Sequence, residues 1–167
     1  MRELLPERYK GKRIVDRIPY TMPGELILPA VSQGNQFNDG TFTNNVDLAV
    51  EVHRVLYGLT SLAAANALQA DPAGAFGDLR KWVRVAIKGV GFTREITKNS
   101  QLLTSLAPAL AAPSPALGSV WEWFYPQTLD KGEGYDVRAD NALPAAAAAN
   151  GIRLEWTFQG YLIIVES

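Results

Sequence analysis

The sequence predicts an all-β protein, an antiparallel β-sandwich of about eight strands with short helical insertions. Several segments alternate apolar and polar residues, as strands with one buried face do. These segments are short and are separated by turns rich in glycine and proline, which is typical of antiparallel two-sheet folds. The chain has 167 residues, of which 47% are hydrophobic and 20% charged, which is enough for one domain with a buried core.

Residues 1–45 are predicted to form an extended N-terminal arm, and residues 46–167 to form the sandwich domain. The arm contains many helix-breaking residues, namely Pro6, Gly11, Pro19, Pro23, Gly24, Pro29, Gly34 and Gly40. Residues 13–20 and 24–30 can form short extended pieces, whereas residues 32–45 have the composition of turns. Because the arm cannot bury much apolar surface alone, it either lies on the sheets of this domain or reaches a neighbouring subunit.

The other predicted strands follow from alternation in the rest of the chain. They are VDLAVEVHRV (46–55), KWVRVAIKGV (81–90), TREIT (93–97), SVWEWFY (119–125) and GYDVRAD (134–140), together with the C-terminal stretch. Pro126 is expected to end the aromatic strand at 119–125. Two alanine-rich segments, 60–74 and 143–151, carry helix start and stop residues and predict the helical insertions.

The C-terminal stretch, RLEWTFQGYLIIVES, is the most apolar predicted strand. Leu154, Trp156 and Phe158 share one face, and after Gly160 the run is apolar on both faces. Such a run is typical of a central strand covered on both sides. Gly160 is therefore expected at a bend or bulge where the alternation changes phase. We expect loss of the last seven residues to unfold the domain.

Composition and motifs argue against catalysis and against most ligand classes. The net charge of −1 gives no bias toward nucleic acid or an anionic membrane, and no segment approaches a membrane span. The charged N-terminus does not resemble a secretory signal, so we expect a soluble protein that is used where it is made. The chain has no cysteine and one histidine, His53, and it has no Gly-x-Ser-x-Gly motif. No cofactor, no metal site and no enzyme activity are therefore predicted.

Two further motifs are predicted to be turns without a ligand. The acidic residues Asp130, Glu133 and Asp136 surround two glycines and match a calcium loop poorly, so they predict a hairpin turn. The Gly-x-Gly of KGVGFT (88–93) is followed by a predicted strand and not by a helix, so it lacks the geometry of a phosphate loop.

Aromatic residues supply the candidate interface. The segment WEWFY places rings on both faces of its strand, and such rings can form a two-sided core or can contact a sugar or a protein partner. Aromatic residues in the arm are harder to assign to a core and are reasonable anchors on another subunit. The candidate interface residues are Tyr9, Tyr20, Phe42, Trp121 and Trp123.

The order of these segments over residues 40–167 resembles the jelly-roll capsid decoration (cement) proteins of tailed bacteriophages. The resemblance rests on the lead-in NDGTFTN, VDLAVEVHRV, WVRVAIKGVGFTREITKNSQLLTSLA, WEWFYPQTLDKGEGYDVRADN and the closing IRLEWTFQGYLII. It implies a jelly-roll-like sandwich without catalysis, a structural virion protein that stabilises the shell by bridging major capsid protein subunits. Such a protein is made in the host cytoplasm, contacts copies of itself as a dimer or trimer, and lies on the capsid surface.

Three alternatives stay open at this point. A tail, baseplate or head-fibre component has the same sequence character as a head protein. A carbohydrate-binding sandwich module is expected to carry Trp121 or Trp123 on a concave face, with Asn, Asp or Arg beside it. A sandwich enzyme is expected to have a deep pocket with a strongly perturbed acid.

Overall fold

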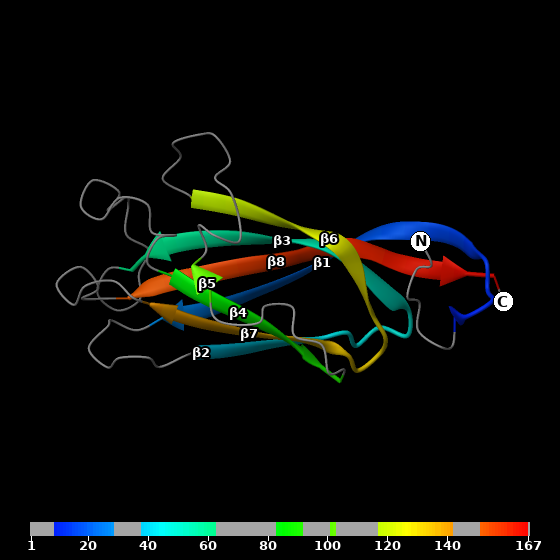
Figure 1. The fold of residues 1–167 in the computed structure, drawn as a ribbon, viewed down its shortest axis with the longest axis horizontal. Coiled ribbons are helices and arrows are strands. Elements are labelled where there is room, and N and C mark those ends of the chain that lie inside the picture. Colours follow the sequence, from blue (N-terminus) through cyan, green and yellow to red (C-terminus); the bar gives the residue numbers. More distant parts are fainter. Residues whose placement is uncertain are drawn as a thin grey trace.

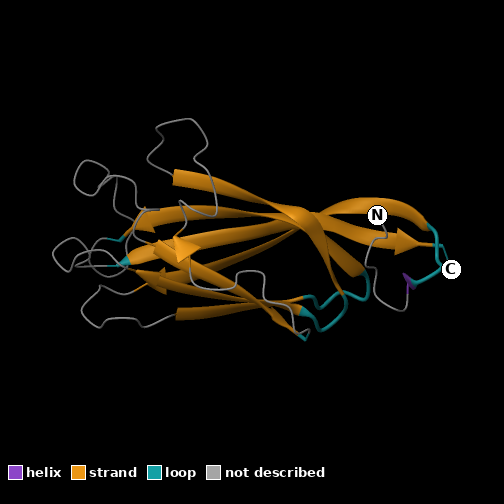
Figure 2. Ribbon diagram, in the orientation of Figure 1, coloured by secondary structure: helices purple, strands orange, loops and turns teal. Residues whose placement is uncertain are grey.

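The computed structural model describes residues 9–28, 38–62, 83–91, 101–102, 117–141 and 151–166, and this part of the chain is all-β (Figures 1 and 2). Its eight strands are β1 (Ile14–Leu28), β2 (Asn38–Thr43), β3 (Ala49–Ser61), β4 (Val83–Val90), β5 (Gln101–Leu102), β6 (Leu117–Leu129), β7 (Gly134–Asn141) and β8 (Ile152–Val165). The predicted all-β class with antiparallel sheets is confirmed. The predicted helices at 60–74 and 143–151 lie, except at their ends, outside the described residues, as does the predicted strand at 93–97.

The strands form two four-stranded antiparallel sheets. The first sheet has the order β1-β8-β3-β6 and the second has the order β2-β7-β4-β5. One buried core receives side chains from both sheets, including Val55 and Phe158 from the first and Val85 and Val137 from the second. Each large apolar side chain buried in this way contributes about 1.5–3 kcal/mol relative to an exposed one.

The C-terminal strand β8 is central in the first sheet, as predicted. It pairs with β1 on one side and with β3 on the other, and its residues Ile152, Leu154, Trp156 and Phe158 are buried. Beyond Gly160 its other face is also covered, because Ile163 is buried in a second, smaller cluster with Tyr9 and Ala49. The run that is apolar on both faces is therefore covered on both sides at Ile163.

The described part of residues 1–45 belongs to the two sheets of this chain. β1 pairs with β8 along its whole length, and β2 pairs with β7. The two extended pieces predicted at 13–20 and 24–30 are one continuous strand, which contains Pro19 and Pro23. A strand tolerates proline at a sheet edge, where a missing N–H breaks no ladder bond, and β1 is an edge strand. The segment 38–43, which has turn composition, is also a strand.

Trp156 connects the two sheets near their β1 and β2 edges. Its indole is 3% exposed and lies between two glycines, Gly24 of β1 and Gly40 of β2. A Cβ atom at Gly24 would lie 2.5 Å from Cζ2 of the indole, and a Cβ at Gly40 would lie 2.6 Å from Cη2. Both positions therefore require glycine to leave room for the ring.

Candidate functional site

A bulge in β3 shapes the outer face of the first sheet. The pairing of β3 with both β6 and β8 shifts register between Val52 and Arg54. Before the shift, the even-numbered residues Val50 and Val52 face the core. After the shift, the odd-numbered residue Val55 faces the core. His53 and Arg54 therefore both lie on the outer face, as expected when a bulge adds one residue to a strand.

The phase change was predicted at Gly160, and the structure places it one strand away. The prediction of a phase change in the C-terminal strand at Gly160 is wrong: Gly160 is paired with Val52 next to the register shift, but the extra residue is His53 of β3. Alternation along β8 continues, with Phe158 and Leu162 both on the core side. A Cβ at Gly160 would lie 1.9 Å from the carbonyl oxygen of Glu51, so the neighbouring backbone approaches too closely for any other residue.

The same irregularity changes the course of β6. Val52 pairs with Gln127 and Arg54 pairs with Glu122, so residues 123–126 lie opposite the single residue His53. The prediction that Pro126 ends this strand is wrong, because β6 continues to Leu129. Proline interrupts the pairing here without ending the strand, as it can at an edge strand with a bulge.

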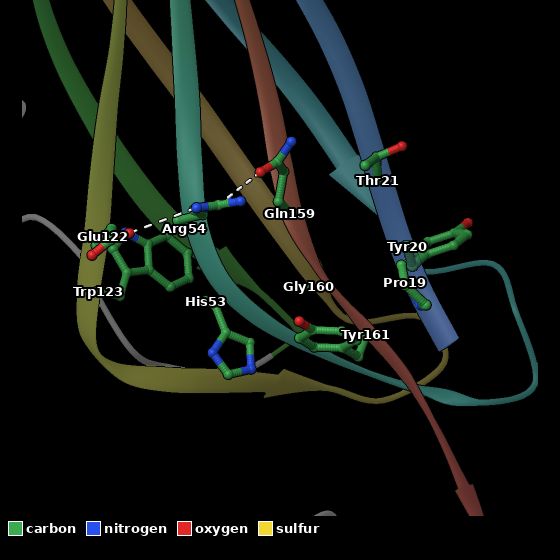
Figure 3. Close-up of a pocket in the computed structure, with 10 residues that line it drawn as sticks. All are labelled: Pro19, Tyr20, Thr21, His53, Arg54, Glu122, Trp123, Gln159, Gly160 and Tyr161. Atoms are coloured by element: carbon green, nitrogen blue, oxygen red, sulfur yellow. Dashed lines mark hydrogen bonds and ion pairs between the residues drawn. The ribbon is translucent and has the colours of Figure 1, made fainter. Parts of the chain in front are cut away.

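A groove of about 530 Å³ lies at this bulge and is shown in Figure 3. All four strands of the first sheet contribute to its lining, which comprises Pro19, Tyr20, Thr21, His53, Arg54, Glu122, Trp123, Gln159, Gly160 and Tyr161. Its volume is within the range of roughly 300–1,000 Å³ that is usual for small-molecule sites. The groove is open to solvent, since 47% of the Arg54 side chain and 75% of the Glu122 side chain are exposed.

Four polar residues cross the groove as one row. Thr21 pairs with Gln159, Gln159 pairs with Arg54, and Arg54 pairs with Glu122 across successive strands. The Nε atom of Arg54 donates to Oε1 of Gln159 over 2.7 Å, and its NH1 atom lies 3.6 Å from Oε1 of Glu122 (Figure 3). This bond uses the amide oxygen of Gln159, so the amide nitrogen is the atom that can donate to a ligand.

A second group of side chains lies beside this row and includes the histidine of the chain. Glu51 is 6% exposed, and its Oε1 atom is 2.5 Å from Nε2 of His53, while its Oε2 atom is 3.6 Å from NH2 of Arg17. The His53 ring meets the ring of Tyr161 edge-on at 5.4 Å (Figure 3). A buried carboxylate thus holds the imidazole, which in turn supports an exposed tyrosine ring.

The sequence-predicted interface residues are distributed between the core and this groove. Tyr9 is 4% exposed, and its hydroxyl accepts a hydrogen bond of 2.9 Å from the backbone N–H of Ala49. Tyr20, Phe42, Trp121 and Trp123 are half-buried and pack against the core. Tyr20 and Trp123 also line the groove. Their part in contacts with another subunit stays a prediction.

The groove combines residues that sequence reasoning did not connect. Among them, Arg54, Gln159 and Tyr161 come from two strands that are far apart in the chain and adjacent in the sheet. The sequence does contain one indication of the bulge. Two consecutive polar residues, His53 and Arg54, interrupt the alternation, and the core positions change from even-numbered before them to odd-numbered after them. One of the two predicted turns is confirmed: Asp130 and Glu133 lie in the β6–β7 connection, where the Glu133 N–H donates to the Asp130 carbonyl over 3.1 Å. Of the segment 88–93, residues 88–90 belong to β4, Gly91 follows the strand with a φ of +83°, and residues 92–93 lie outside the described residues, so the turn predicted there stays a prediction.

Within the described residues, no three acidic or histidine side chains are close enough together to hold a metal ion. The same part of the chain has no helix with the length and apolarity that crossing a membrane requires. No family model and no curated protein matches this sequence.

Proposed function

We propose that this chain is a jelly-roll capsid decoration protein, which stabilises the shell of a tailed bacteriophage by bridging major capsid protein subunits. It works by surface contact and not by catalysis, and it contacts copies of itself as a dimer or trimer. The observation that carries the proposal is the nesting of the strand pairs. β1 pairs with β8, β2 with β7, β3 with β6 and β4 with β5.

The nesting supports a jelly-roll sandwich over other two-sheet arrangements. Such nested antiparallel pairs arise when the chain folds into one long two-stranded ribbon, in which the first half of the chain pairs with the second half. Successive pairs lie alternately in the two sheets, which wraps the ribbon around one core. Eight-stranded jelly rolls have this character and occur widely in viral capsid domains and in lectins.

The distribution of exposed apolar residues favours contact through the β1 edge. Four large apolar side chains of the described chain are notably exposed, and all lie on β1 or on the adjacent β8. They are Val15 at 53%, Ile18 at 43%, Ile27 at 44% and Tyr161 at 37%. Val15, Ile18 and Tyr161 lie at the same end of the β1–β8 pair, and clustered apolar exposure marks contact surfaces more often than single exposed residues do. A stable contact with the shell needs about 1,000 Å² or more of total buried area.

The test uses the genes beside the coding sequence, which are expected to encode a major capsid protein and a portal protein. Purified chain is mixed with empty capsids assembled from that capsid protein and is sedimented through a gradient. We expect the chain to sediment with the shells and to raise their melting temperature, because a ligand of the assembled lattice stabilises it by mass action. A chain that stays at the top of the gradient at micromolar concentration overturns the proposal.

A matched pair of variants tests the β1 edge. Val15→Ser removes exposed apolar surface from β1, and Arg84→Ser removes an exposed side chain from β4 in the other sheet. Weaker shell binding by Val15→Ser alone is the expected result. If the two variants affect shell binding equally, the chain can still be a shell-binding protein, but β1 is not the surface that binds.

A carbohydrate-binding module is the second candidate, because one observation favours it. Trp123 and Arg54 line the same groove, which is the juxtaposition expected of such a module. The indole of Trp123, however, packs edge-on against Tyr135 at 5.4 Å on the core side. The exposed aromatic ring of the groove is therefore that of Tyr161.

A further inference from the structure

We propose that the groove at the β3 bulge binds a neutral, linear glycan that lies across the strands of the first sheet. Tyr161 is the ring on which a sugar stacks, and Arg54 and Gln159 are the principal hydrogen-bonding residues. This inference rests on the second candidate function and assigns its ligand class and its binding residues.

The charge of the groove indicates a neutral ligand. The guanidinium of Arg54 faces the carboxylate of Glu122, and the carboxylate of Glu51 faces both Arg17 and His53. Among the described residues that line the groove, Arg54 and Glu122 balance each other, and beside the groove Glu51 lies 3.6 Å from Arg17, so neither sign is in excess for an anionic or cationic partner to balance. Planar amide, guanidinium and carboxylate groups remain, and these suit pairs of adjacent hydroxyl groups.

The spacing of the polar row indicates the orientation of the glycan. Thr21, Gln159, Arg54 and Glu122 are cross-strand neighbours, so they project from four adjacent strands. Adjacent strands are about 4.8 Å apart, and the row therefore spans about 14 Å. That strand spacing is close to the repeat of successive sugar rings in an extended glycan. A glycan lying across the strands can meet one polar side chain at each ring.

The aromatic part of the site is held in place before any ligand binds. The Tyr161 ring is 37% exposed, which leaves a face for the C–H groups of a sugar. Its position is fixed by edge-on contact with His53, whose imidazole is held by the buried Glu51 carboxylate. Preorganised side chains lose little rotamer freedom on binding, which favours affinity.

Gly160 contributes backbone alone to the lining of the groove. It lies between Gln159 and Tyr161 on the central strand, and the backbone of Glu51 excludes any side chain at this position. Between Gln159 and Tyr161 the lining of the groove is therefore the backbone of Gly160. Gly160 is paired with Val52 next to the register shift that places His53 and Arg54 on one face.

The experiment is titration calorimetry of the full chain with three neutral hexasaccharides, namely cellohexaose, maltohexaose and chitohexaose. We expect at least one to bind with a dissociation constant below the millimolar range. Arg54→Ala and Tyr161→Ala are each expected to weaken that binding at least tenfold. The matched control is Arg138→Ala in the second sheet, because the side chains of Arg54 and Arg138 are both 47% exposed and each lies beside an acidic residue.

The outcomes separate the inference from the function on which it rests. If none of the three hexasaccharides binds at millimolar concentration, both the inference and the second candidate function fail. If one binds but Arg54→Ala and Tyr161→Ala bind like Arg138→Ala, the function survives and the assigned groove is wrong. Binding of a heparin hexasaccharide in preference to all three neutral probes overturns the neutral ligand class. Circular dichroism of each variant confirms that lost binding does not reflect unfolding.

Discussion

Replacing Gly40 with alanine tests the packing between the two sheets. The new Cβ would lie 2.6 Å from Cη2 and 3.1 Å from Cζ2 of the Trp156 indole, and 3.2 Å from Cδ2 of Leu26. The indole has little room to move, because it is also close to Gly24, where an added Cβ would lie 2.5 Å from Cζ2. Overpacking of this kind costs about 1–3 kcal/mol. Alanine also reduces the conformational entropy of the unfolded chain, which stabilises the folded state by about 0.4–1 kcal/mol. We therefore expect the free energy of unfolding to fall by about 1–2 kcal/mol.

Gly58→Ala is the matched control, since Gly58 is also a strand glycine without positive φ. A Cβ there has its nearest neighbour, Oε2 of Glu155, at 3.5 Å, which is ordinary contact. Urea unfolding followed by circular dichroism should show a lower midpoint for Gly40→Ala and an unchanged or higher midpoint for Gly58→Ala, with the same slope for both. In a Trp156→Phe background the cost of Gly40→Ala should fall by more than about 1 kcal/mol. Equal midpoints for the two alanine variants would refute this account of the packing.

Three further predictions concern stability. Tyr57→Phe should leave the free energy of unfolding unchanged or raise it, because no described residue bonds the buried hydroxyl of Tyr57. Tyr9→Phe should lower it by about 1–2 kcal/mol, because the Ala49 N–H loses its partner. The midpoints of urea unfolding compare the two variants. Burial raises the pKa of Tyr57, so the folded state keeps a proton that the unfolded state loses above about pH 10. Unfolding free energy should therefore fall by about 1.4 kcal/mol per pH unit above that point, and Tyr57→Phe should lack this contribution in pH-dependent urea titrations. Deleting residues 161–167 should abolish cooperative thermal unfolding in calorimetry, because it removes Ile163 from its buried cluster; a normal transition would contradict this.

The strands that the sequence predicted best have one buried face and regular alternation. In β4, Val83, Val85 and Ile87 are buried while Arg84 and Lys88 are exposed, as their order in the sequence requires. The period of two is visible because every second residue enters the core and its neighbours meet solvent. Pairing partners and strand order have no comparable local signal, because they depend on contacts between residues far apart in the chain.

The strand β2 shows why composition alone misled the prediction. NDGTFT has the residues of a turn, yet it pairs with β7 from Asn38 to Thr43. Tertiary contacts override the local preference here: Phe42 packs against Phe158 at 6.1 Å, and Gly40 provides space for Trp156. In β1, likewise, Pro19 and Pro23 divide the sequence into two pieces, but their position at a sheet edge removes the penalty.

The candidate site was largely beyond sequence reasoning, because it arises from a bulge that joins four strands. His53 is half-buried against Glu51 and Tyr161. The register shift that places His53 beside Arg54 on the outer face depends on the pairing of β3 with β6 and β8. The sequence holds only a trace of it, in the change from Val50 and Val52 to Val55 as core residues.

The edges of both sheets bear on how this protein contacts a partner. A partner strand can extend a sheet only where an edge offers a continuous row of N–H and C=O groups. β1 lacks two N–H groups at Pro19 and Pro23, and β6 contains Pro126 within its irregular segment. In the second sheet the edge strands as described are short, with six residues in β2 and two in β5. Strand addition is therefore disfavoured at each edge, and the contact with a shell that we propose would instead use exposed side chains such as Val15 and Ile27.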